Sequence, residues 1–240
     1  MFDFEIQRGK RYVLPIPKWL RGDLLNFNRL YAFPTIPESL GDSQFIILDS
    51  GAYTLSKRRK TMDIKYIDKL YEHYKKYKTS KNIICVAPDV AGDFKKTMKN
   101  YEYFRTKYDL NVMPVLQFPD HEFNWSLLKY QIEFYKDFIA DIQMMFFAKR
   151  GAYSSELYAY EVDKKIRYIQ NEIGIDWIHL FAAGWNRVEC RMIGKLNNKI
   201  TMDSIAYYLT TNNYIDWGHD KGDRQKNSIE NAKIANIMVN

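Results

Sequence analysis

Short apolar runs alternate along the chain with polar loops and with segments of helical length. The apolar runs lie at 12–17, 45–50, 82–89, 111–118, 143–149, 177–184 and 199–204. Segments with helical spacing lie between or after them, near 63–78, 93–107, 125–139, 155–173, 186–196 and 227–238. In the first of these, Ile64, Ile67, Leu70, Tyr71 and Tyr74 recur at the spacing of one helix face. The alternation predicts parallel strands joined by helices.

The expected fold is therefore an α/β barrel of the (β/α)8 TIM-like type. A chain of 240 residues has the usual size of one such barrel, and we expect a single domain over 1–240. The apolar runs leave the pattern one strand short, so either a further strand lies near 28–33 or the barrel is reduced. A doubly wound open sheet is the alternative, although the usual glycine-rich dinucleotide loop is absent from the sequence.

Polar residues gather where the apolar runs end. They are Asp49, Ser50 and Gly51 after the second run, Asp89 after the third, Gln117 after the fourth, Gly184 after the sixth and Asp203 after the last. In a barrel these positions face the rim on which active sites are built. A carboxylate directly after an apolar strand is costly to bury unless it is paired or used. An aspartate in this position is also a frequent helix N-cap, and that alternative stays open for each one. Their coincidence predicts a site with two or three aspartates.

Composition narrows the class of protein. Hydrophobic residues make up 46% of the chain, enough for a substantial core, which argues against a disordered protein. No stretch approaches the roughly 18 apolar residues of a membrane span, and the first residues lack a signal-peptide pattern, so we expect a cytoplasmic protein without membrane contact. Two cysteines and no CxxC pair do not make a four-cysteine zinc site. We expect no metal or cofactor, and we expect Cys85 to be a buried thiol.

Charge and aromatic residues favour a polyanionic partner. The net charge is +7, and a basic balance of this kind suits a nucleic acid. Tyrosines beside lysines in YEHYKKYK, at 71–78, are able to stack bases while the lysines neutralise phosphates. The alternative is an amphipathic surface helix whose Tyr71 and Tyr74 lie on the barrel.

Several segments resemble one known family when they are taken in order. LDSGAYTLS, at 48–56, resembles the Asp-Ser-Gly-Gly-Phe/Tyr-Gln signature of tRNA-guanine transglycosylases. Weaker matches to later motifs of that family follow in the same order, so that the resemblance spans about residues 45 to 205. They are APDVAG at 87–92, PVLQF at 114–118, HLFAAG at 179–184 and TMDS at 201–204.

The departures from the family pattern also carry information. Ala52 and Thr54 replace a glycine and a glutamine of the signature, and a Gly-Gly strand end is replaced around Phe147-Ala148. The zinc subdomain of the tRNA enzymes and its cysteine-rich motif are missing. These features resemble the compact relatives, known from phages and bacterial genomic islands, that insert 7-deazaguanines into DNA. The resemblance thus implies DNA, in preference to tRNA, as the polymer.

The resemblance implies a base-exchange transferase with a covalent intermediate. It makes Asp203 the nucleophile that attacks C1′ of a guanosine nucleotide, and it makes Asp49 the acid–base group for the departing and entering bases. The resemblance assigns recognition of the base to Asp89 and Gln117. The rest of the implied base site consists of Tyr53 and Phe181 on the two faces of the base, together with Ser50, Gly51 and Gly184. For both aromatic residues the alternative is core packing.

Basic residues beside the signature complete the hypothesis. Lys57, Arg58, Arg59 and Lys60 follow it directly and would clamp phosphates beside a flipped nucleotide; a solvated loop is the alternative. Arg224 is a weaker candidate in the polar stretch before the last helix. The expected partners are a nucleic acid and a 7-deazaguanine such as preQ0, with a second copy of the chain or an accessory protein. Competing hypotheses are a tRNA-guanine transglycosylase, a nucleoside glycosylase or transferase, and a noncatalytic nucleic-acid-binding barrel.

Overall fold

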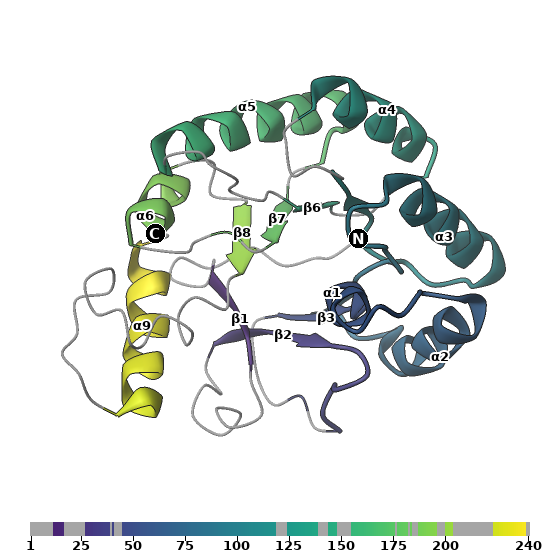
Figure 1. Ribbon diagram of the computed structural model, residues 1–240, viewed down its shortest axis with the longest axis horizontal. Coiled ribbons are helices and arrows are strands. Elements are labelled where there is room, and N and C mark those ends of the chain that lie inside the picture. The colour runs from purple at the N-terminus through teal and green to yellow at the C-terminus, as the bar shows by residue number, and fades with distance from the viewer. Residues whose placement is uncertain are drawn as a thin grey trace.

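Eight parallel strands form one curled sheet, and the helices other than the short α1 lie along its outer side (Figure 1). The computed structural model describes residues 12–16, 27–38, 40, 45–118, 124–138, 144–147, 155–175, 177–181, 183, 187–195, 200–203 and 223–238. The strands are β1 (Tyr12–Pro15), β2 (Asn28–Ala32), β3 (Ile46–Asp49), β4 (Ile83–Cys85), β5 (Val115–Leu116), β6 (Met144–Phe147), β7 (Ile178–Phe181) and β8 (Ile200–Asp203). They are hydrogen-bonded in the order β4-β3-β2-β1-β8-β7-β6-β5.

This order distinguishes the sheet from a doubly wound one. Each strand in the order lies beside its neighbour in sequence, and the first strand, β1, pairs with the last, β8. A doubly wound sheet would reverse its order at a switch point and carry helices on both faces. Beyond the two strands at the ends of the order, an isolated parallel bridge joins Val86, after β4, to Met113, before β5.

The helices follow the strands closely along the chain. They are α1 (Ala52–Lys57), α2 (Ile64–Tyr74), the 3-10 turn η2 (Lys75–Tyr77), α3 (Phe94–Lys107), α4 (Trp125–Lys136), α5 (Ser155–Ile173), α6 (Arg187–Gly194) and α9 (Arg224–Met238). The side chains of Asp63, Asp93 and Asn124 cap α2, α3 and α4 by accepting from backbone N–H groups of the first turn. None of the helices in the described ranges is long and apolar enough to cross a membrane.

Most of the predicted elements are confirmed. The strand expected near 28–33 is β2. In α2, Ile67, Leu70 and Tyr74 are buried as their spacing predicts, although Ile64 is exposed. Tyr71 packs against the same core, which confirms the amphipathic surface helix as the structure of this segment. The sequence did not predict α1, and α9 begins at Arg224 rather than at 227.

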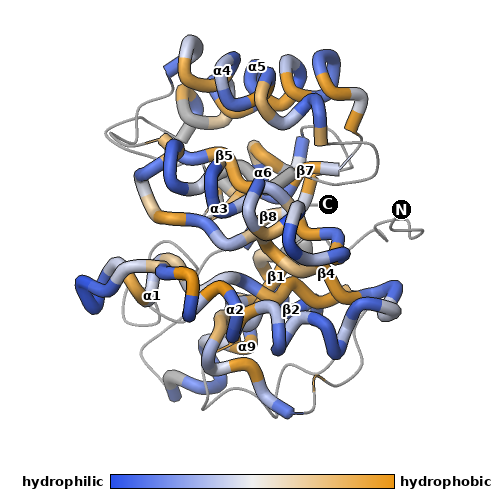
Figure 2. The backbone as a smooth tube through the Cα atoms, turned by 90° about the vertical axis from the view of Figure 1, so that its right-hand side faces the viewer, coloured by the Kyte–Doolittle hydropathy of each residue, from blue (hydrophilic) through white to orange (hydrophobic). Residues whose placement is uncertain are grey.

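The apolar residues fall into two groups, one on each face of the sheet. The larger group combines strand residues such as Leu48 with helix residues such as Tyr101, and therefore fills the space between sheet and helices. The smaller group consists of strand and strand-flanking residues, namely Val13, Leu30, Phe45, Ile47, Ile84, Val86, Met113, Val115 and Trp177. Because side chains alternate along a strand, this second group marks the inner face of the curled sheet. In Figure 2 the helices alternate between hydrophilic and hydrophobic residues, as expected of helices with one buried face.

Candidate active site

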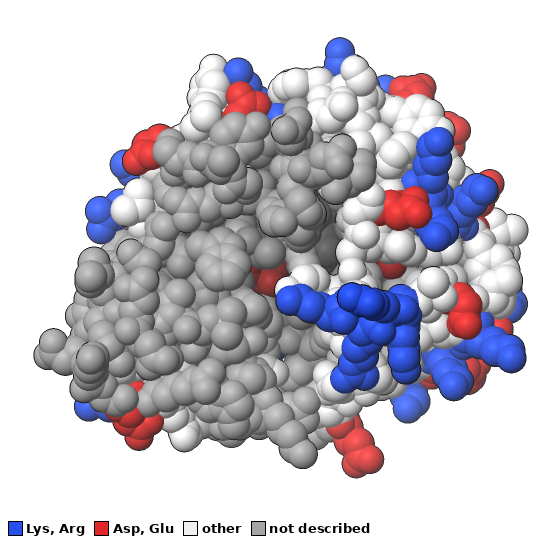
Figure 3. Space-filling view, viewed as in Figure 1, with Lys and Arg blue, Asp and Glu red and all other residues white. Residues whose placement is uncertain are grey.

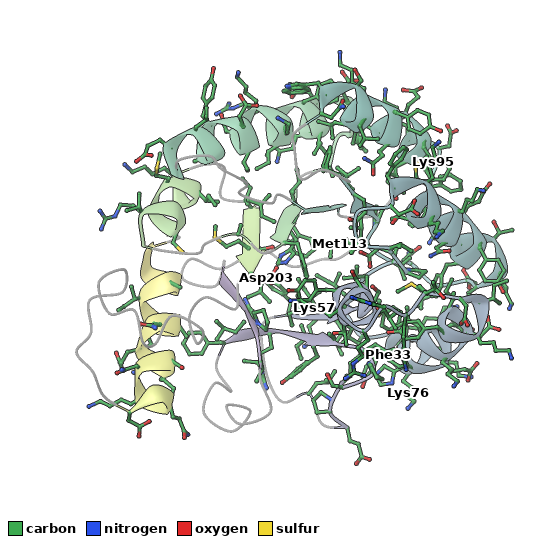
Figure 4. All side chains as sticks on the ribbon, viewed as in Figure 1. Phe33, Lys57, Lys76, Lys95, Met113 and Asp203 are labelled. Carbon is green, nitrogen blue, oxygen red and sulfur yellow. The ribbon has the colours of Figure 1, made fainter. Side chains whose placement is uncertain are left out.

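Three aspartates lie at the carboxyl ends of the strands. Asp49 and Asp203 are the last residues of β3 and β8, and Asp89 follows β4. Asp49 is two residues after Ile47 of the inner group, and it therefore projects toward the inner face as well. The three carboxylates are almost fully buried, with exposed fractions of 7% for Asp49, 7% for Asp89 and 3% for Asp203. Figure 4 shows Asp203 near the middle of the molecule, inside the arc of helices.

The environment of Asp49 favours its protonated form. Burial raises the pKa of Asp49 to about 7, and the negative charges of Asp89 and Asp203 act in the same direction. The N–H of Gly51 donates to Asp49 Oδ2 over 3.0 Å and opposes this shift in part. A carboxyl group that gains and loses its proton near neutral pH is suited to general acid–base chemistry.

Asp89 is held by a network of hydrogen bonds. Its Oδ1 accepts from the hydroxyl of Ser50, and its Oδ2 accepts from Nε2 of Gln117 over 2.7 Å. The Gln117 Oε1 accepts from the N–H of Gly92 over 3.0 Å, so the orientation of the amide group is fixed. Burial raises the pKa of Asp89 to about 6, although these hydrogen bonds to Ser50 and Gln117 lower it. The result is a carboxylate that faces the site in one defined orientation.

A residue that the sequence did not single out holds Gln117 in place. Gln131 of α4 is fully buried, and its Oε1 accepts from the backbone N–H of Gln117 over 2.9 Å. Its Nε2 donates to the backbone carbonyl of Gln117, also over 2.9 Å. A glutamine at a helical spacing otherwise filled by Leu128, Ile132 and Tyr135 is the pattern that would have revealed it.

Asp203 contacts a histidine on the neighbouring strand. His179 Nε2 lies 3.0 Å from Asp203 Oδ1, and His179 Nδ1 lies 2.9 Å from the hydroxyl of Thr201. The indole N–H of Trp177 donates to the same hydroxyl over 3.0 Å. These side chains are buried, and His179 was not among the residues predicted from the sequence. Its position two residues after Trp177, on a strand with an apolar inner face, is the feature that could have drawn attention to it.

The turn between β3 and α1 sets the position of Asp49. Gly51 has a φ of 82°, which favours glycine, and a Cβ atom there would lie 2.1 Å from the carbonyl oxygen of Phe33. The Ser50 hydroxyl accepts from the N–H of Ala52 over 3.3 Å, and the Tyr66 hydroxyl donates to the Ser50 carbonyl over 2.9 Å. Ser50 and Gly51 therefore shape the turn.

The capping alternative is wrong for two of the three aspartates. The N-cap of α1 is Gly51, which makes no side-chain hydrogen bond, and the N-cap of α3 is Asp93 rather than Asp89. For Asp203 the alternative concerns a helix at 205, which lies outside the described residues.

The structure describes two further residues of the predicted base site, Tyr53 and Phe181. Tyr53 on α1 is 53% exposed, and Lys57 Nζ lies 5.2 Å from its ring centroid. Phe181 ends β7 and packs against the inner apolar group, partly buried. A cavity of about 210 Å3 opens between α1 and the start of α3, with Lys60, Asp89 and Lys96 among its lining residues. It offers a polar space next to Asp89.

The basic run after α1 is exposed at every position from Lys57 to Lys60. Figure 3 shows a group of lysines and arginines beside a hollow in the middle of the face that it draws.

The other predictions for the site have mixed outcomes. Arg224 is the first residue of α9 rather than part of a polar loop, and its side chain is outside the described part of the molecule, as is Gly184. Among the described residues no group of His, Cys, Asp and Glu has the arrangement of a metal site. Cys85 is buried, as predicted.

We compared the chain with models of protein families, with curated proteins and with solved structures, and none of them matched it. The family resemblance therefore depends on the motifs alone, and the site has to be interpreted from its own geometry.

Proposed function

We propose that this protein is a transglycosylase that replaces guanine in DNA with a 7-deazaguanine such as preQ0. The observation that carries the proposal is the group of three buried aspartates at the carboxyl ends of β3, β4 and β8. Each has different surroundings: Asp49 is pushed toward its protonated form, Asp89 is fixed by Ser50 and Gln117, and Asp203 contacts His179. A general acid–base group and a nucleophile that are both carboxyl groups need such different surroundings. The ordered motifs between about 45 and 205 support the same assignment.

The scaffold that we infer for this chemistry is a closed (β/α)8 barrel without a zinc subdomain. The pairing of β1 with β8 and the bridge between Val86 and Met113 support closure. Two backbone hydrogen bonds cross that bridge, from the N–H of Ala87 to the Met113 carbonyl over 2.9 Å and from the N–H of Met113 to the Cys85 carbonyl over 2.8 Å. In such barrels the catalytic residues come from the carboxyl ends of the strands, where the three aspartates lie.

The proposed reaction consists of two displacements at C1′ of the sugar. Asp203 attacks C1′ as the bond from C1′ to N9 of guanine breaks, and the protonated Asp49 gives its proton to the departing base. The 7-deazaguanine then loses its N9 proton to Asp49 and attacks C1′, which releases Asp203 as a carboxylate. Two inversions give net retention, as in the retaining glycosidases. Asp49 ends the cycle protonated, as it began, and no other reactant is needed.

Recognition of the base is assigned to Asp89 and its partners. Each oxygen of an ionised carboxylate can accept more than one hydrogen bond, so those from Ser50 and Gln117 leave capacity for a ligand. Guanine and 7-deazaguanines present an N1–H and a 2-amino group that donate together to one carboxylate. Adenine has an acceptor at N1 and no 2-amino group, which disfavours it. Tyr53 and Phe181 would stack on the two faces of the base, with Ser50, Gly51 and Gly184 shaping the site.

Base exchange provides the direct test. The full chain is incubated with labelled preQ0 and, separately, with single-stranded DNA, duplex DNA and tRNA, and incorporation of label is measured. We expect label in DNA, with single strands preferred because no base pair has to open. Asp203→Asn should abolish incorporation, whereas Asp93→Asn, the same change at the α3 cap, should preserve it. Full exchange by Asp203→Asn, or incorporation into tRNA alone, would contradict the proposal in its nucleophile or in its polymer.

The phosphate clamp has a separate test in the salt dependence of binding. We expect the double variant Lys57→Gln/Lys60→Gln to reduce the slope of log affinity against log salt for single-stranded DNA by about 1.4, at roughly 0.7 per phosphate contact. The matched control is Lys76→Gln/Lys81→Gln, two exposed lysines of which the first lies in η2 and the second just before β4. Figure 4 shows Lys76 near the outer edge of the molecule. Equal slopes for the two variants would exclude the clamp, and salt-independent exchange on mononucleosides would favour the nucleoside hypothesis.

A further inference from the structure

A chain of buried polar groups runs along the inner face from Trp177 to Asp203. The pairing of β7 with β8 places His179 opposite Thr201. Trp177, directly before β7, is two residues from His179, and Thr201 is two residues from Asp203 on β8, so all four side chains project to the same face. The side chains of His179 and Thr201 are completely buried. A buried polar chain of this kind needs a reason, because apolar residues would fill the same space at less cost.

The direction of the hydrogen bonds follows from the groups involved. An indole N–H can only donate, so the Thr201 hydroxyl is the acceptor of the 3.0 Å contact from Trp177. The hydroxyl has a single proton, and the 2.9 Å contact with His179 Nδ1 is where that proton can be donated. His179 Nδ1 is then an acceptor, and the neutral ring carries its proton on Nε2. That N–H lies 3.0 Å from Asp203 Oδ1 and donates to it.

The opposite tautomer is a worse fit to these contacts. With the proton on Nδ1, both Trp177 and His179 would donate to the Thr201 hydroxyl, whose own proton would require a third partner. The contacts among the described residues include no such partner for the hydroxyl. The bare Nε2 would also place a lone pair against the carboxylate oxygen of Asp203, which is repulsive.

We propose that His179 is a positioning residue for Asp203, and that Trp177 and Thr201 fix its ring as the Nε2–H tautomer that donates to the carboxylate. The role of Asp203 as nucleophile is taken from the proposed function. The donated hydrogen bond favours the ionised carboxylate and limits it to one orientation toward the sugar. In the second displacement negative charge returns to Asp203 as the C1′–O bond breaks, and the same N–H stabilises that charge without reorganisation.

The tautomer can be tested whether or not the protein exchanges bases. The full chain is labelled with 15N in its four histidine rings, and His179→Gln identifies the signals of His179. At neutral pH we expect Nε2 to have the shift of a protonated ring nitrogen and Nδ1 that of an unprotonated one. Thr201→Val should weaken this preference and Thr201→Ser should restore it. A proton on Nδ1 in the unaltered protein would overturn the proposed direction.

The positioning role is tested by kinetics on the same variants. His179→Phe should lower kcat about 100-fold, the usual cost of a misplaced reacting group, with little change in KM for the base. His179→Gln, which keeps an N–H donor, should recover part of the rate. Because loss of the donor makes Asp203 easier to protonate, the acid limb of the pH–rate profile should move to higher pH in His179→Phe.

Two other carboxylates of the site also affect the pH–rate profile, and comparing the two His179 variants separates their effect from that of His179. Asp49 and Asp89 also titrate in this site, and changes in their ionisation would alter the profile in both variants alike. If the role of His179 were merely structural, His179→Phe and His179→Gln would both have a lower melting temperature, and the acid limbs of their pH–rate profiles would coincide. Coincident acid limbs in His179→Phe, His179→Gln and the unaltered enzyme would overturn the positioning role. If no base is exchanged by any form, the proposed function fails, while the 15N measurement still decides the tautomer.

Discussion

At the scale of single residues, the raised pKa of Asp49 makes the folding stability of the protein depend on pH. The Asp49 pKa of about 7 in the folded protein compares with an ordinary value of 3.8. Between these two values the folded protein binds more protons than the unfolded chain does. The folded protein therefore keeps its full stability with respect to Asp49 below about pH 4. It loses this stability as the pH rises through 7, because the buried carboxyl group then has to ionise. Asp89, with a pKa of about 6, acts in the same direction.

Asp49→Asn should remove this penalty, because its amide group stays neutral at every pH. We expect the variant to be more stable than the unaltered protein at pH 8 by a few kcal/mol, at about 1.4 kcal/mol per pKa unit, and to be nearly equal to it at pH 4. Urea unfolding at the two pH values measures the difference. Asp109→Asn is a control in which stability should change with pH in the opposite direction, because Lys78 lowers the pKa of that exposed carboxyl. A stability gain of Asp49→Asn that is the same at both pH values would contradict the raised pKa.

Some residues of this site were predictable from the sequence, and others were not. Asp49 and Asp203 were predictable because a carboxylate directly after FIIL or KITM interrupts an apolar strand. His179 and Gln131 were not singled out, since one polar residue within an apolar strand or helix has many ordinary explanations. Their role depends on which strand or helix lies next to them. The contact of His179 with Asp203 requires the pairing of β7 with β8, which periodicity does not specify.

At the level of elements, the turn from β3 to α1 combines a constrained backbone with the position of a catalytic candidate. Periodicity did not predict α1, because six residues are too few for a helical pattern and no side chain caps its start. Longer helices such as α3 and α5 were predicted to within a residue or so. The turn itself was visible as the polar residues Ser50 and Gly51 at the end of an apolar run, and again through the family signature that contains them.

Two glycines with similar φ values allow the cost of the left-handed backbone to be separated from the cost of a steric clash at this turn. Gly51 and Gly174 have φ values of 82° and 74°, but a Cβ atom at Gly51 would lie 2.1 Å from Phe33 O, whereas the space around Gly174 is open. Gly174→Ala should cost only the left-handed conformation, about 1 kcal/mol. Gly51→Ala should cost roughly 3 kcal/mol or more, because the backbone of Phe33 has to move as well.

Chemical denaturation of the two alanine variants measures this difference. We also expect Gly51→Ala to lose base exchange, because the N–H of Gly51 donates to Asp49 Oδ2. Gly174→Ala lies beyond α5 and should keep its exchange activity. Equal losses of stability in the two variants would show that the turn yields easily and does not constrain Asp49.

At the level of the whole molecule, the parallel order of the strands was predictable, whereas closure of the sheet into the expected barrel stays a proposal. Alternating apolar runs and helices specified parallel strands that follow one another, and the missing strand was β2. Whether the ends of such a sheet meet depends on the curvature of all its strands together, and a single run does not contain that information. The proposed closure therefore depends on the short contact between Val86 and Met113.

Amide hydrogen exchange tests whether this contact closes the barrel. The N–H of Val86 donates to Leu48 within the β3–β4 pair over 2.9 Å, and the N–H groups of Ala87 and Met113 form the bonds that cross between β4 and β5. All three residues are completely buried, so burial alone does not distinguish them. In a closed barrel their amides should exchange together, by the global unfolding reaction, with the same dependence on denaturant. In a sheet that opens at β4 and β5, Ala87 and Met113 would exchange faster than Val86, because an edge strand loses its hydrogen bonds without global unfolding.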